Sequence, residues 1–119
     1  MTTHTPERLP IESVISPWMP IDDKHDLALL AKLIEECNEL SGRAARIIMS
    51  GWEEPDPKSG KTNREELRNE TSDVEACITM LRRAKEGVEA DIEREYKKVR
   101  GFNRWHKMIA NLLAGRPAE

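Results

Sequence analysis

The chain has few aromatic residues, few cysteines and no long apolar runs. Aromatic residues make up 4% of its 119 positions, and only two cysteines are present. The longest apolar runs, such as LALLA, are far too short to cross a bilayer. These absences argue against a membrane span and against a scaffold built on disulfides.

A secretory signal and a strong net charge are also lacking. The first residues, MTTHTPERLP, have neither a basic n-region nor an apolar h-region, so we expect a reduced, cytoplasmic setting. Cys37 and Cys77 are predicted to lie on the inward faces of their helices as small core residues. The net charge of −3 gives no general attraction to nucleic acid, so a nucleic-acid polymer is not an expected partner.

The distribution of proline and apolar residues predicts an arm followed by one domain. Residues 1–25 carry four prolines and little periodicity, which indicates an extended N-terminal arm. Residues 26–115 are predicted to form a single all-α domain, with a loop rich in glycine and proline at 51–63. The expected architecture is a helical bundle built around two long antiparallel helices.

Helical periodicity and helix-breaking residues give the expected boundaries. The first helix is predicted from about residue 26 to 50, and the second from Asn63 to about Ala84, with Asn63 and Glu66 as a capping box. A break at Gly87 precedes a highly charged helix that we expect to end at Gly101. A last short helix is predicted over residues 105–113.

Four acidic residues lie where these helices should be apolar. At about 100° per residue, Glu36 falls in the stripe that should face the core, and Glu39 lies one turn further on. Glu70 and Asp73 take equivalent places on the second helix. Burying several like charges together is costly unless protons or a cation neutralise them. A metal site is the simplest interpretation, and an unusual charged core is the alternative.

The residue types narrow the choice of metal. Oxygen ligands from carboxylates suit a hard ion such as Mg²⁺ or Mn²⁺, whereas zinc would require histidine or cysteine. A di-iron bundle needs Glu-x-x-His motifs, and none of the three histidines follows a glutamate at that spacing. We therefore expect Mg²⁺, with Mn²⁺ as a substitute.

Residues 29–81 resemble the MazG-like, all-α nucleoside triphosphate pyrophosphohydrolases. The resemblance is carried by KLIEECNEL, by a loop with GW and prolines, and by TNREELRNETSDVEACITML. The signature of that family is ExxE followed by ExxD, and the small phage-type and bacterial single-domain members are most similar. The resemblance implies hydrolysis of a nucleotide to its monophosphate and pyrophosphate with Mg²⁺. The residues matching the family's metal ligands are Glu36, Glu39, Glu70 and Asp73.

Further roles follow from the same resemblance. Glu35 corresponds to an extra carboxylate that ligates metal or positions the attacking water. Lys98, Asn103 and Arg104 resemble a basic cluster that family members carry near this point, with Arg100 as a further candidate. Members of the family assemble as dimers or tetramers, so a homodimer or homotetramer is expected.

Some assignments keep a structural alternative. The basic residues of YKKVRGFNRWHK suit the leaving phosphates, but a solvated helix end would look the same. Trp52 is the best of the three tryptophans for stacking on a base, and it is equally suited to a core or an oligomer contact. Asn63 would bind a base or sugar, or only cap its helix.

The leading hypothesis is a Mg²⁺-dependent hydrolase of a (deoxy)nucleoside triphosphate that acts in nucleotide pool control or house-cleaning. The alternative of a different class is a non-catalytic helical dimerisation or interaction module, in which the charged stripes pair with a partner chain. A third possibility keeps the enzyme but changes the substrate to a non-standard nucleotide, such as an oxidised nucleotide or an alarmone.

Overall fold

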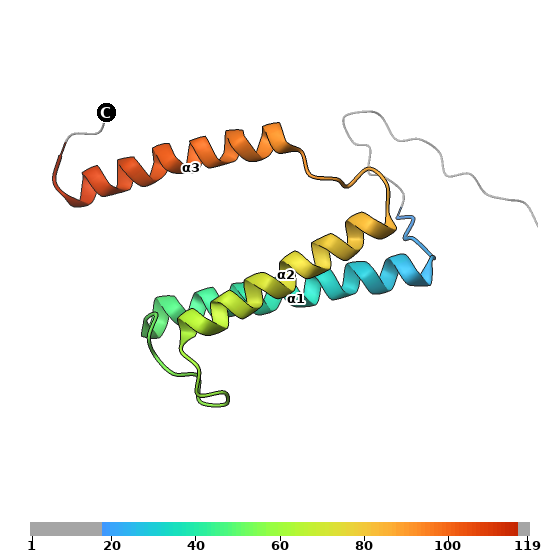
Figure 1. Ribbon diagram of the computed structural model, residues 1–119, viewed down its shortest axis with the longest axis horizontal. Helices are drawn as coiled ribbons and strands as arrows, with labels where there is room; N and C mark the ends of the chain where they lie inside the picture. Colours follow the sequence, from blue (N-terminus) through green and yellow to red (C-terminus); the bar gives the residue numbers. More distant parts are fainter. Residues whose placement is uncertain (1–17, 117–119) are drawn as a thin grey trace, which may run out of the picture.

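The computed structural model describes residues 18–116, which fold into three α-helices (Figure 1). They are α1 (Lys24–Ser50), α2 (Asn63–Ala84) and α3 (Ile92–Leu113). The described residues contain no β-strand, only an isolated bridge between Pro55 and Thr62. The expected all-α class is confirmed. Residues 1–17, which hold most of the predicted arm, lie outside the described part of the chain.

The ends of α1 are set by local hydrogen bonds. Asp23 is the N-cap, and its side chain accepts from the backbone N–H of Asp26 at 2.9 Å. The helix ends at Gly51, whose φ of 92° is a left-handed conformation that glycine adopts without strain. The N–H of Gly51 donates to the carbonyl of Ile47 at 2.8 Å, which satisfies one of the last free carbonyls.

The N-cap of α2 is Thr62, so the predicted capping role of Asn63 is wrong. The Thr62 hydroxyl accepts from the backbone N–H of Glu65 at 3.1 Å. Asn63 is the first helical residue and only 3% exposed, because its side chain is hydrogen-bonded to the end of α1. Both residues fit a helix start, and only the tertiary contact distinguishes them.

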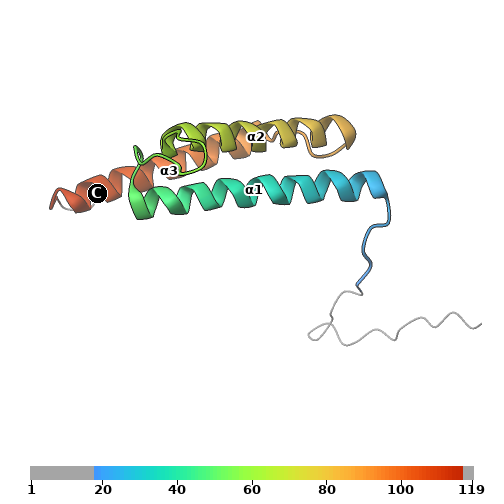
Figure 2. The ribbon, with the colours of Figure 1, turned by 90° about the horizontal axis from the view of Figure 1, so that it is seen from below.

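The two long helices lie side by side (Figures 1 and 2). Near the start of α1, the Nζ of Lys85 lies 2.8 Å from the Oδ2 of Asp26. Towards the other end, Arg43 donates to the Oδ1 of Asn63 at 2.9 Å. The least exposed residues of each helix recur at helical spacing and face the other helix. On α1 these include Leu29, Leu33, Glu36, Leu40, Arg43 and Ile47, and on α2 they include Leu67, Glu70, Val74, Cys77 and Leu81.

One of the two cysteines departs from the predicted inward faces. Cys77 is half-buried as expected, but Cys37 is exposed, so its assignment to the core is wrong. Cys37 follows Glu36 directly, and one residue turns a helix by about 100°, which moves Cys37 out of the stripe centred on Glu36.

The third helix is one continuous element, so the predicted break at Gly101 is wrong. It begins after the N-cap Asp91, whose side chain accepts from the N–H of Arg94 at 3.0 Å. Gly101 keeps a negative φ, unlike Gly87 in the preceding linker, where φ is 84° and the predicted break is confirmed. Glycine in a helix interior costs about 1 kcal/mol relative to alanine, which weakens a helix without ending it.

Helix α3 is separate from the pair formed by α1 and α2 (Figure 1). It leaves large apolar side chains such as Tyr96, Phe102 and Leu112 exposed. No hydrophobic side chain within residues 18–116 is buried. The radius of gyration is 21.3 Å, against about 14 Å expected for a compact domain of this length. Residues 18–116 of a single chain therefore form no apolar core of the kind that normally stabilises a domain.

The length and the apolar content of a helix decide whether it can cross a membrane. None of the helices within residues 18–116 combines the length and the apolar content that a bilayer crossing requires.

Candidate metal centre

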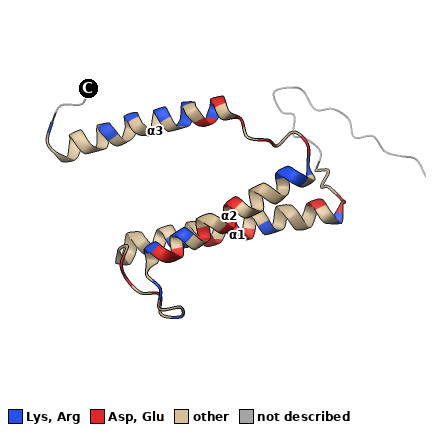
Figure 3. Cartoon of the chain, viewed as in Figure 1, with Lys and Arg blue, Asp and Glu red and all other residues tan. Residues whose placement is uncertain are grey.

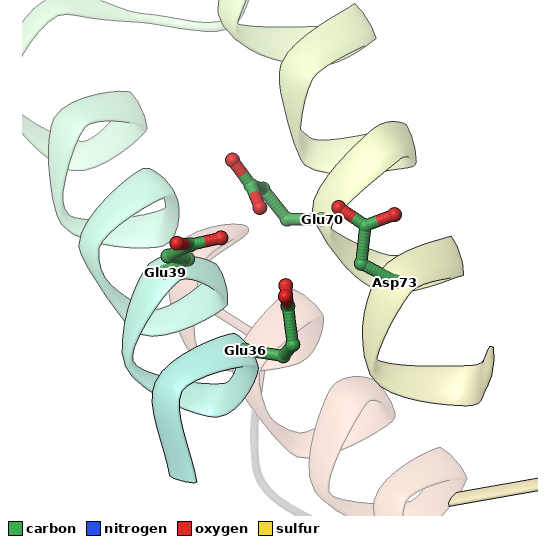
Figure 4. Close-up of side chains that lie close together, drawn as sticks. All are labelled: Glu36, Glu39, Glu70 and Asp73. Carbon is green, nitrogen blue, oxygen red and sulfur yellow. The ribbon is translucent and has the colours of Figure 1, made fainter. Parts of the chain in front are cut away.

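Four carboxylates meet in the middle of the helix pair (Figure 4). Glu36 and Glu39 project from α1 towards Glu70 and Asp73 on α2, and one oxygen from each lies within 4.8 Å of the others. These are the four residues that the sequence placed on the inward faces. We call this group the acidic cluster.

The acidic cluster holds uncompensated negative charge. The pKa of Glu39 is raised, mainly by repulsion from the Glu36 carboxylate and to a smaller extent by partial burial. Glu36 itself is only 8% exposed. One of its oxygens, Oε1, lies 3.2 Å from the Nζ of Lys32, while the other, Oε2, is buried and has no hydrogen-bond partner among residues 18–116.

This arrangement fits a divalent cation. A buried carboxylate oxygen without a partner is costly, and a cation placed among the four carboxylates would satisfy it. All four ligands offer oxygen, which suits Mg²⁺ or Mn²⁺. Lys32 supplies one positive charge against four negative ones, and its side chain is half exposed.

Glu35 lies next to the acidic cluster without joining it. Its carboxylate is 57% exposed and pairs with the Nζ of Lys32 at 3.4 Å. The one-residue step from Glu36 turns it away from α2, as it does for Cys37. The structure thus places Glu35 beside the acidic cluster, on the solvent side of α1.

A second polar network anchors the loop between α1 and α2. Arg43, 8% exposed, donates to the Oδ2 of Asp56 at 3.0 Å and to Asn63. Arg46 donates to the same oxygen of Asp56 at 2.8 Å. The backbone N–H groups of Ser59 and Lys58, and then Arg43, lower the pKa of Asp56 to about 2. The loop is therefore held by a buried ion pair.

Sequence reasoning missed the arginines of this network, although a signal was present. Arg43 follows Glu36 by seven residues, and Arg46 follows Glu39 by seven. A spacing of seven returns to the same helix face within about 20°, so both arginines continue the inward acidic stripe. Their partner Asp56 lies in the loop, where helical periodicity gives no information.

The two expected base contacts lie at the loop end of the helix pair. Asn63 uses its amide to donate to the carbonyl of Gly51 at 2.9 Å, and its oxygen accepts from Arg43. Its polar atoms are therefore engaged within the chain. The Trp52 ring is 47% exposed, and the guanidinium of Arg64 lies 4.9 Å from its centroid.

The expected phosphate-binding residues lie on α3. Lys98, Arg100, Asn103 and Arg104 are all exposed on this helix, which makes no close contact with α1 or α2. Figure 3 shows acidic residues where α1 and α2 run side by side and basic residues along α3. Within one chain, the structure does not bring these four residues to the acidic cluster.

The comparisons with protein-family models, with curated proteins and with solved structures gave no match to this chain.

Proposed function

We propose that the protein hydrolyses a (deoxy)nucleoside triphosphate to the monophosphate and pyrophosphate, with Mg²⁺ bound at the acidic cluster. The observation that carries this proposal is the unpartnered, buried Oε2 of Glu36 among four converging carboxylates. The ion pair with Lys32 engages only the Oε1 of Glu36, and a cation among the four carboxylates would give Oε2 a partner. The proposed reaction would serve nucleotide pool control or house-cleaning.

The chemistry of the acidic cluster suits this reaction. Mg²⁺ is usually held by a few carboxylates together with substrate phosphates, and it stabilises the charge that develops in phosphoryl transfer. Glu36, Glu39, Glu70 and Asp73 are the proposed ligands. For Glu35 we propose the role of positioning the attacking water. Its carboxylate lies beside the acidic cluster on the solvent side of α1, where a water molecule has access.

The proposal includes an assembly of at least two copies. The exposed apolar residues of α3, and Leu27, Leu30, Ile34 and Ile48 on α1, need a partner surface. An ion pair near one end of α1 and α2, and a hydrogen bond from Arg43 to Asn63 near the other, support the antiparallel pair as its building unit. In a homodimer or homotetramer, α3 of a second copy would carry Lys98, Arg100, Asn103 and Arg104 towards the acidic cluster.

The proposal is tested by measuring pyrophosphate release from the eight common ribo- and deoxynucleoside triphosphates, with Mg²⁺ and with excess EDTA. We expect metal-dependent pyrophosphate from at least one of them, and none from the Glu36→Gln variant. Release that persists in EDTA, or in Glu36→Gln, would contradict the proposal. A panel extended to oxidised nucleotides and alarmones separates a non-standard substrate from the absence of catalysis.

The exposed apolar side chains also favour a second candidate, a non-catalytic helical interaction module. In that case the acidic cluster would pair with basic residues of another chain. The melting temperature separates the two candidates, because a cation that binds only the folded protein must raise it. An interaction module predicts no change with millimolar Mg²⁺.

A further inference from the structure

A hollow lies beside the acidic cluster, between α1 and α2. It is lined by Glu39, Gly42, Arg43, Arg46 and Glu70, and its volume is about 210 Å³. A water molecule takes about 30 Å³ of the liquid, so the hollow has room for several waters or for one small anion. Four of the lining residues follow one face of α1 at helical spacing.

The hollow is acidic at one end and basic at the other. Glu39 and Glu70 belong both to the hollow and to the acidic cluster. At the basic end, Arg46 is held by Asp56 at 2.8 Å, yet its side chain is 56% exposed. The Nε of Arg43 is buried and has no hydrogen-bond partner within the described residues. Because this Nε is inaccessible, Arg46 is the arginine of the hollow that can reach an anion with several oxygen atoms.

Gly42 lines the hollow from the interior of α1. Glycine is among the least favourable residues in a helix interior, so a packing or binding reason is expected for it. A Cβ added to Gly42 would meet no atom within 4 Å, so no packing within the chain requires glycine here. Gly42 instead leaves open space where it lines the hollow.

We propose that this hollow binds the pyrophosphate end of the substrate, with Arg46 contacting the phosphate oxygens and Gly42 leaving the space that they occupy. The proposal rests on the proposed function, because pyrophosphate is the product of that reaction. It assigns phosphate binding to residues of the same chain as the acidic cluster, in addition to the basic residues of α3.

Binding of the anion should depend on Mg²⁺. Without a cation, Glu39 and Glu70 would repel phosphate from the hollow that they line. A cation at the acidic cluster would remove that repulsion, so each ligand should strengthen the binding of the other by the same factor. Pyrophosphate is therefore expected to bind only when Mg²⁺ is present in excess.

The first test is calorimetric titration of inorganic pyrophosphate in excess Mg²⁺ into the wild type, Arg46→Met and Arg68→Met. Arg68 is an exposed arginine of α2 that does not line the hollow, which makes it a matched control for loss of charge. We expect Arg46→Met to weaken binding about tenfold or more, since a hydrogen bond to a charged group contributes that much. Arg68→Met should bind as the wild type does. Equal binding by Arg46→Met and the wild type would overturn the proposal.

The second test compares Gly42→Ala with Gly101→Ala. Both replace a glycine inside a helix, so both should raise the melting temperature by a few degrees. Only Gly42→Ala places a methyl group in the hollow, and only this variant should bind pyrophosphate more weakly. Unchanged binding by Gly42→Ala would contradict the proposed occupancy.

Nucleotide kinetics distinguish a failure of this proposal from a failure of the proposed function. If Arg46→Met hydrolyses nucleotide with the wild-type kcat and KM, the anion site is wrong and the enzyme proposal stands. If pyrophosphate binding depends on Arg46 and on Mg²⁺ but no nucleotide is hydrolysed, the anion site stands and the enzyme proposal is wrong.

Discussion

At the scale of single residues, Glu36 is the centre of the proposed site. It is the most buried member of the acidic cluster, and its two oxygens differ in their surroundings. The Nζ of Lys32 forms an ion pair with Oε1 at the helix surface. Oε2 faces the other three carboxylates (Figure 4) and has no hydrogen-bond partner within the described residues. A buried oxygen without a partner is costly, and a bound cation would remove that cost.

Replacing a carboxylate of the acidic cluster by its neutral amide should change both turnover and melting temperature. Glu36→Gln and Asp73→Asn should abolish turnover, because each removes a proposed ligand while the shape of the side chain is kept. In EDTA, both variants should melt at a higher temperature than the wild type, because each removes one negative charge from the acidic cluster. Glu36→Gln also removes the main repulsion that raises the pKa of Glu39. Thermal scans with EDTA and with Mg²⁺ measure both effects. Melting below the wild type in EDTA would contradict the proposed repulsion.

The acidic residue of the loop network gives a prediction about pH. Asp56 has a pKa of about 2 in the folded protein, against 3.8 ordinarily. A lowered pKa means that its contribution to stability is complete above pH 3.8 and is lost as the pH falls towards 2. Urea unfolding of the wild type and Asp56→Asn between pH 2 and 5 measures this contribution. The difference between the two proteins should shrink as the pH falls, and a constant difference would contradict the assignment.

At the scale of the elements, periodicity predicted the helix pair and its inward acidic residues. This succeeded because the side chains of an amphipathic helix repeat every 3.6 residues, so one sequence suffices to place Glu36 and Glu70 on the inner faces. Single positions were less predictable. Thr62 rather than Asn63 caps α2, and Gly101 does not end a helix, because tertiary contacts and neighbouring helix formers decided these cases.

The loop between α1 and α2 could be recognised from its glycines and prolines, but its contacts could not. Asp56 bonds to Arg43 and Arg46 across ten or more residues, and such pairings depend on the fold rather than on local pattern. The same holds for the hollow, which appears only when α1 and α2 are placed together.

Asn63 ties the start of α2 to the end of α1, which makes its contribution to stability measurable. Asn63→Ala should lower the free energy of unfolding by about 2–3 kcal/mol, because the carbonyl of Gly51 and the Nη1 of Arg43 each lose a hydrogen-bond partner. Thr62→Ala removes only a helix cap and should cost about 1 kcal/mol. Urea denaturation of both variants measures the two losses of unfolding free energy. A larger loss in Thr62→Ala than in Asn63→Ala would contradict this prediction.

At the scale of the whole molecule, the dominant feature is that the three helices of the described part form no apolar core. The described residues bury no hydrophobic side chain, and α3 leaves its apolar residues exposed. Helices of this kind gain most of their stability from tertiary or quaternary packing. Copies of this chain are the partner that is always present, which is why the proposed function includes assembly.

Light scattering tests the proposed assembly. The wild type should have a mass of at least twice the 13.6 kDa of one chain. Phe102→Glu should shift the mass towards 13.6 kDa, because it places a charge among the apolar residues of α3. Glu93→Lys is the control for a changed charge, since Glu93 is exposed and lies about 180° away around the same helix. A monomeric wild type would contradict the proposed assembly.

The most direct measurement is a calorimetric titration of Mg²⁺ into the wild type and into Glu36→Gln, without nucleotide. The acidic cluster predicts saturable binding to the wild type, accompanied by a rise in melting temperature, and no binding or much weaker binding to Glu36→Gln. If the wild type binds no Mg²⁺, or if the two proteins bind it equally, the four carboxylates are not a metal centre and the proposed reaction loses its basis.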